Sequence, residues 1–128
     1  MLDFLTTLHQ LSFWQIVLTG GIATGWGIRA WRQARFSDGF RSILFVTEGS
    51  GVAQGLLGGI LFLAGCRPAD ILHLVYGLIV IAAIPVAIGY ASEKMEKRDM
   101  AILAFAAFAI VAAALRGAMT GVGGYCPR

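Results

Sequence analysis

Four apolar stretches of about 20 residues each constrain this chain more than any other feature of its sequence. They lie at 12–30, 42–64, 71–91 and 100–119, separated by short charged or turn-like segments. A helix needs about 20 mostly apolar residues to cross a bilayer. Strands of a membrane β-barrel would instead show alternating apolar and polar residues in segments of about ten, whereas these stretches are continuous. We therefore predict four membrane-spanning helices.

The composition supports this prediction. Of the 128 residues, 58% are hydrophobic and 13% charged, whereas a soluble domain averages about 45–50% apolar and about 25% charged residues. A soluble globular enzyme is therefore excluded, and the four stretches leave no room for a soluble domain or a long linker. The expected fold is an all-α integral membrane protein, a single four-transmembrane-helix bundle over residues 1–128 with short loops.

The basic residues predict the orientation of these helices. Lys and Arg gather in the loops on the cytoplasmic side of a membrane protein. The first and third connections hold seven of the ten basic residues, namely Arg29, Arg32, Arg35, Arg41, Lys94, Lys97 and Arg98. We expect these connections inside and both termini outside, in a bacterial inner membrane. The net charge of +3 then reflects topology and contact with the lipid bilayer, and no nucleic acid partner is expected.

The two cysteines fall on the side that this charge distribution places outside. Cys66 lies in the middle connection and Cys126 in the C-terminal tail, and an oxidising compartment supports disulfides. We predict a Cys66–Cys126 bridge that clamps the tail to the middle connection. Two unrelated free thiols are the alternative. A redox-active pair would usually show the spacing Cys-x-x-Cys, which this sequence lacks.

Small residues at helical spacing predict where the helices pack. In lipid, close backbone approach through small residues holds helices together. The glycines at such spacing are Gly21 and Gly25 in the first stretch, Gly51, Gly55 and Gly59 in the second, and Gly117 and Gly121 in the fourth. We expect these faces to hold the bundle together. The alternative is that one of them docks onto another membrane protein.

Ionisable residues inside the apolar stretches are candidate functional residues, because they are costly in hydrocarbon. Glu48 shares a helical stripe with the glycines of the second stretch. We expect it to point into the bundle as a paired carboxylate, with Arg29, Arg32 or Arg41 within reach. A proton or cation site is the alternative.

A second polar group is predicted near the outer surface. Asp70, His73 and Tyr76 follow one another at a spacing of three residues, and Arg116 lies at the matching depth of the fourth stretch. We expect an Asp70–Arg116 ion pair with His73 as a hydrogen-bonding neighbour. The same group could instead contact a cofactor, such as the head group of a quinone or a carboxylate of a porphyrin.

Haem held by two histidines is a further alternative, because His9 and His73 both lie toward the outer surface. Against it, segment 3–12 resembles an amphipathic interfacial stretch more than part of the bundle. We therefore expect no cofactor, with haem or quinone as the alternative. No metal cluster, nucleophile with a base, or phosphate-binding loop can be assembled from the sequence, so no enzymatic activity and no metal site are expected.

Three functions remain. The first is a small non-catalytic accessory or assembly subunit of a larger membrane complex, such as a respiratory or photosynthetic electron-transfer complex, with the larger subunits as partners. A short four-helix protein with minimal loops resembles, in size and layout, the small accessory subunits that surround such complexes in bacteria, and no motif supports a particular family. The second is a small redox protein that binds haem or quinone around His73. The third is a transporter or channel. Transport needs a polar path across the full thickness of the membrane, and the sequence offers none.

Overall fold

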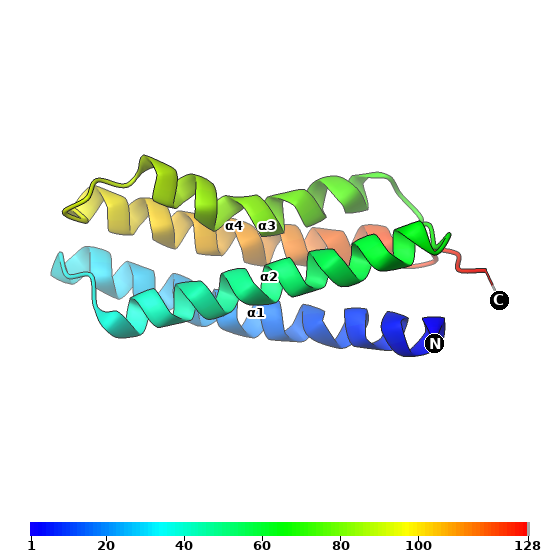
Figure 1. The fold of residues 1–128 in the computed structure, drawn as a ribbon. Helices are drawn as coiled ribbons and strands as arrows, with labels where there is room; N and C mark the ends of the chain where they lie inside the picture. Colours follow the sequence, from blue (N-terminus) through cyan, green and yellow to red (C-terminus); the bar gives the residue numbers. More distant parts are fainter. Residues whose placement is uncertain (128) are drawn as a thin grey trace.

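The computed structural model describes residues 1–127, which form a bundle of four α-helices joined by short connections (Figure 1). The helices are α1 (Leu2–Gln33), α2 (Asp38–Leu63), α3 (Leu72–Tyr90) and α4 (Lys97–Gly121). Met1, the α2–α3 connection and residues 122–127 lie at one end of the bundle, which we call the terminal end. The α1–α2 and α3–α4 connections lie at the other, which we call the basic end.

Three helices, α2, α3 and α4, are long and apolar enough to cross a membrane. Helix α1 does not meet this criterion, although it is 32 residues long. Polar and small residues such as Gln15, Thr19 and Gly20 interrupt its apolar residues. A bundle of four helices, three of which could span a membrane, is therefore established.

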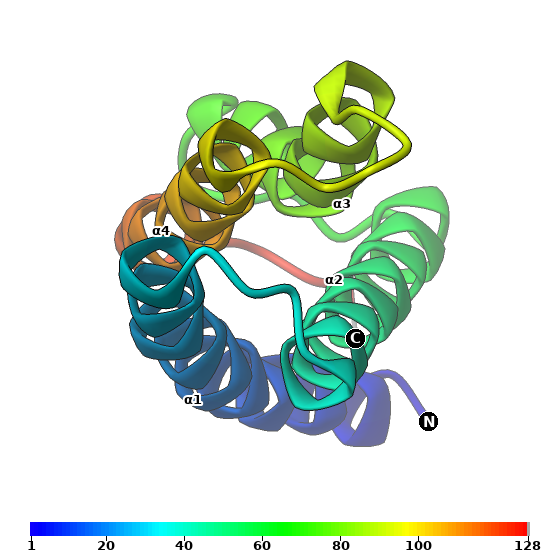
Figure 2. The same ribbon diagram turned by 90° about the vertical axis from the view of Figure 1, so that its left-hand side faces the viewer.

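Each helix packs against two others, so the four form a ring in the order α1, α2, α3, α4 (Figure 2). Helix α4 contributes most to the core, with Leu103, Ala107 and Ile110 fully buried. It packs closely on α1 because small residues meet there. A Cβ atom added to Gly27 would lie 2.7 Å from the Cβ atom of Ala104. This is the backbone approach that small residues permit between membrane helices.

The glycines singled out in the sequence fall into two groups. Gly51 and Gly55 face Val80 and Ile81 of α3, Gly117 lies beside Tyr76, and Gly121 lies against His73. Gly21, Gly25 and Gly59 have no neighbouring atom within 4 Å of an added Cβ. These last three glycines therefore do not pack within the chain, contrary to the expectation that they hold the bundle together. On α1 the packing positions are Gly20 and Gly27 instead.

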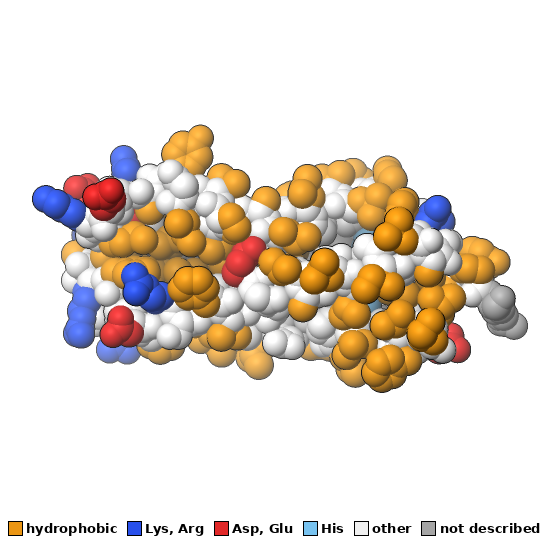
Figure 3. All heavy atoms as spheres, in the orientation of Figure 1, with side chains coloured by type: hydrophobic (Ala, Val, Ile, Leu, Met, Phe, Trp, Pro, Cys, Tyr) orange, Lys and Arg blue, Asp and Glu red, His pale blue; other side chains and the backbone are white. Residues whose placement is uncertain are grey.

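Most of the charged side chains in Figure 3 gather at the basic end, whereas hydrophobic side chains are spread along the rest of this face, with an acidic side chain near its middle. The carboxylate of Asp99 organises the α3–α4 connection at this end. It accepts hydrogen bonds from the hydroxyl and the backbone N–H of Ser92 and from the backbone N–H of Glu96. Glu96 caps α4 in return. The aromatic ring of Trp31 lies 5.5 Å from the ammonium group of Lys97, which joins the ends of α1 and α4.

Candidate functional site

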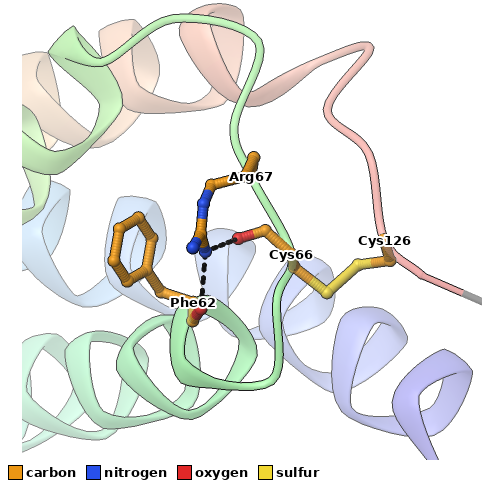
Figure 4. The surroundings of a disulfide bond; sticks show 4 residues. All are labelled: Phe62, Cys66, Arg67 and Cys126. Atoms are coloured by element: carbon orange, nitrogen blue, oxygen red, sulfur yellow. Dashed lines mark hydrogen bonds between the residues drawn. A yellow bond between two sulfur atoms is a disulfide. The ribbon is translucent and has the colours of Figure 1, made fainter.

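A disulfide closes the terminal end. The sulfur atoms of Cys66 and Cys126 lie 2.00 Å apart (Figure 4), in agreement with the predicted pair. Beside them, the backbone groups of Arg67 and Tyr125 exchange two hydrogen bonds of 2.7 and 2.8 Å. The guanidinium of Arg67 donates to the carbonyl oxygens of Phe62 and Cys66 and stacks on the Phe62 ring. The tail is thus fixed to the α2–α3 connection.

The expected ion pair between Asp70 and Arg116 is not formed. Within residues 1–127 the one ion pair joins Arg98 and Asp99. The Asp70 carboxylate instead accepts a hydrogen bond from the backbone N–H of Leu72, in the first turn of α3, and Arg116 is exposed. The first four N–H groups of a helix lack partners within the helix. By accepting a hydrogen bond from one of them, Asp70 stabilises the start of α3 instead of pairing with Arg116.

His73 lies within the terminal end of the bundle, and its imidazole ring lies beside that of His9. The centres of the two imidazole rings are 6.0 Å apart, and the ring planes are inclined by 60°. His9 therefore belongs to the bundle, and the expectation that segment 3–12 is a separate interfacial stretch was wrong. Helix α1 begins at Leu2 and runs without interruption through His9 into the apolar stretch.

Each histidine ring lies against a glycine of another helix. A Cβ atom on Gly58 of α2 would lie 3.1 Å from Cε1 of His9, and one on Gly121 of α4 would lie 2.9 Å from the His73 ring. Any larger residue at Gly121 would push the His73 ring aside. The two glycines therefore make room for the imidazoles, and all four helices contribute to the site.

Hydrogen bonds from the helices hold the two rings. Nδ1 of His73 lies 2.8 Å from the carbonyl oxygen of Gly117. Nε2 of His9 lies 3.5 Å from the side-chain amide of Gln54, and Gln54 is hydrogen-bonded to Ser12. Nδ1 of His9 is buried and has no hydrogen-bonding partner in the part of the chain that the structure describes. Buried polar atoms are nearly always paired, so this nitrogen is an exception that calls for an explanation.

Tyr76, the remaining member of the predicted polar group, is half-buried one turn along α3. Its Cβ atom would lie 3.6 Å from a Cβ atom added to Gly117. The predicted group is therefore divided. His73 and Tyr76 face α4 within the bundle, whereas Asp70 serves the start of α3.

Glu48 lies apart from this site, in the half of α2 nearer the basic end. Its side chain is half-buried, and Oε2 is buried without a hydrogen-bonding partner among residues 1–127. None of Arg29, Arg32 and Arg41 forms an ion pair with it there. The expected pairing with an arginine was therefore wrong, and Glu48 is a half-buried carboxylate that forms no ion pair within residues 1–127.

The site has no equivalent in the comparisons with known proteins. No protein-family model, no curated protein and no solved structure matches the chain. Within the described residues, no group of three or more His, Cys, Asp or Glu side chains could hold a metal ion. The site must therefore be interpreted from its own chemistry.

The sequence also carries a signal that places His9 on the core face of its helix. His9, Ile16, Ala23 and Ala30 are spaced seven residues apart, and positions at that spacing share one face of a helix. The last three are buried in the core. Extending the core face of α1 towards the N-terminus leads directly to His9. Gln54 and Gly58 could not have been found in this way, because only the tertiary structure places α2 beside His9.

Proposed function

We propose that this chain is a multi-pass protein of a bacterial inner membrane in which all four helices cross the bilayer. The basic end would face the cytoplasm, and the termini and the disulfide would lie outside. Two observations support this orientation. The basic residues gather at one end of the bundle, as expected of cytoplasmic loops. The disulfide lies at the other end, where an oxidising compartment would maintain it.

Within that membrane, we propose that the chain is a small accessory or assembly subunit of a larger complex, without catalytic activity of its own. The observation that carries this proposal is the outer face of α1. Gly21 and Gly25 lie open there, and Leu18 and Ile22 beside them are exposed. Glycines at this spacing allow the backbone of a second helix to approach closely.

The test compares open glycines on two helices. Because Gly21, Gly25 and Gly59 have open space around them, replacing each by Leu should leave the isolated bundle folded. We expect Gly21→Leu and Gly25→Leu to abolish a discrete cross-link from a photoreactive residue at Ile22 to a second membrane protein, in native membranes. Gly59→Leu on α2 is the matched control and should retain the cross-link. The proposal fails if all three variants retain it, or if the wild-type chain cross-links only to lipid.

A further inference from the structure

A cavity of about 200 Å³ lies at the basic end, between the last two turns of α1 and the α1–α2 connection. One water molecule takes up roughly 30 Å³ in the liquid, so the cavity has room for a group of several non-hydrogen atoms. Its walls are formed by Trp26, Arg29, Ala30, Gln33, Arg35 and Ser37.

The turn that ends α1 brings two arginines to this cavity. Ala34 has a left-handed backbone conformation with a φ of 51°, which is a common way for a helix to end. The backbone N–H of Arg35 then donates to the carbonyl oxygen of Ala30, at 3.1 Å. Arg35 and Arg29 therefore line the same cavity, although six residues separate them in the sequence.

The protein does not neutralise these two arginines. Within residues 1–127 the one ion pair joins Arg98 and Asp99, and no acidic residue lines the cavity. Asp38, which follows the cavity residues in the sequence, is exposed. The hydroxyl oxygen of Ser37 accepts a hydrogen bond from the backbone N–H of Phe40, so its own proton is available to donate. Two arginines and a hydroxyl donor suit the oxygens of a phosphate.

We propose that this cavity binds the phosphate of an anionic phospholipid, with Arg29 and Arg35 as its charge partners. Trp26 favours a lipid over a phosphate free in solution. It lies three residues, or about 4.5 Å along the helix, closer to the middle of the bundle than Arg29, and its side chain is exposed. Tryptophan is enriched at the depth of lipid head groups, and basic pockets between membrane helices bind anionic head groups.

The ring of Trp26 is fixed at the edge of the cavity. It packs so closely on Gly39, in the first turn of α2, that an added Cβ atom would collide with it. A lipid whose phosphate contacts Arg29 and Arg35 would therefore place the upper part of its acyl chains against this ring.

The charge of the cavity favours an anionic lipid over a zwitterionic one. Phosphatidylcholine carries an ammonium group beside its phosphate, which would bring a third positive charge to Arg29 and Arg35. No carboxylate lines the cavity to receive that group in the described chain. Phosphatidylglycerol carries the phosphate without the ammonium group, so we expect the cavity to prefer it.

This inference requires the chain to span a membrane but does not depend on the accessory role. Its test uses the purified full-length chain with its disulfide intact, in which Trp14→Phe and Trp31→Phe leave Trp26 as the only tryptophan. The protein is placed in vesicles of phosphatidylcholine with a minor share of phosphatidylglycerol. Bromine atoms, which quench fluorescence, are carried by the acyl chains of one lipid or of the other. We expect brominated phosphatidylglycerol to quench Trp26 more strongly than its share of the lipid accounts for.

The variants assign this preference to the cavity. Arg29→Gln and Arg35→Gln should each reduce it about fivefold, the effect of one basic residue near an anionic surface. Both side chains are exposed, so these variants should fold. Arg32→Gln is the matched control, since it removes the same charge from the same exposed end of α1 but does not line the cavity. It should retain the preference.

Three results would overturn the proposal. Quenching in proportion to the share of each lipid would show that the wild-type chain has no preferred lipid at Trp26. An equal loss of preference in Arg32→Gln and in the two cavity variants would show only a general attraction between charges. Displacement of phosphatidylglycerol by millimolar inorganic phosphate, but not by chloride at the same ionic strength, would show a site for free phosphate. If one cavity variant does not fold, the wild type and the other cavity variant decide the question.

Discussion

The carboxylate of Asp99 accepts hydrogen bonds of 2.5 and 3.1 Å from the hydroxyl and the backbone N–H of Ser92, seven residues earlier in the chain. Asp99 lies in the first turn of α4, before the apolar stretch 100–119, and it is fully buried. The Ser92 hydroxyl is the largest influence that lowers the pKa of this carboxyl to about 2, and the backbone N–H groups of Glu96 and Ser92 add to it. The connection between α3 and α4 therefore depends on an ionised Asp99.

We accordingly expect the stability of the bundle to fall in acid. A carboxyl with a lowered pKa in the folded state stabilises the fold fully above its ordinary pKa near 4, and this stabilisation is lost as the pH falls towards 2. Thermal unfolding in detergent between pH 5 and pH 2 measures the effect. Asp99→Asn should lower the melting temperature at pH 5 and reduce its dependence on pH, whereas Asp38→Asn should resemble the wild type. Parallel curves for Asp99→Asn and the wild type would contradict this prediction.

The α1–α4 seam gives a second prediction. Leu at position 27 would collide with Ala104, and overpacking of a close-packed interior costs about 1–3 kcal/mol. Leu at position 25, half a turn away, meets open space. We expect Gly27→Leu to lower the unfolding temperature and Gly25→Leu to leave it unchanged. Equal unfolding temperatures for these two variants would show that the seam is not close-packed.

The disulfide gives a third prediction. Neither Cys66 nor Cys126 should react with an alkylating reagent until a reductant is added, which electrophoresis without reductant can show. Cys66→Ser should destabilise the protein by at most about 4 kcal/mol, the loop-entropy value for a chain that unfolds in water. We expect a smaller effect, since helices already in a membrane have less freedom to lose. Because the Arg67–Tyr125 hydrogen bonds do not need the sulfur atoms, the tail should stay in place.

The sequence predicted those features that depend on one helix at a time. Continuous apolar stretches gave the four helices, and the charge distribution placed Cys66 and Cys126 at one end. The predicted Asp70–Arg116 ion pair was wrong because Asp70 accepts a hydrogen bond from a neighbouring backbone N–H. Residue spacing along the helices does not reveal such a local hydrogen bond. His9 was expected outside the bundle because segment 3–12 resembled an amphipathic interfacial stretch, although its seven-residue spacing from Ile16 continues the core face of α1. The rotation of α2 that brings Gln54 and Gly58 to His9 depends on packing and is not encoded at any one position.

The last prediction concerns the proposed orientation. In a Cys66→Ser/Cys126→Ser background, single cysteines are introduced at Ser37 and Glu93, in the two connections of the basic end, and at Ala69, in the α2–α3 connection. A membrane-impermeant thiol reagent added to intact spheroplasts should label the cysteine at position 69 and neither of the others. All three should react once the membrane is opened, which controls for buried thiols. Labelling of the cysteines at 37 and 93 from outside would invert the orientation. Labelling of only one of these two cysteines would place positions 37 and 93 on opposite sides of the membrane. An odd number of helices would then cross between them, which contradicts the proposal that both α2 and α3 span the bilayer.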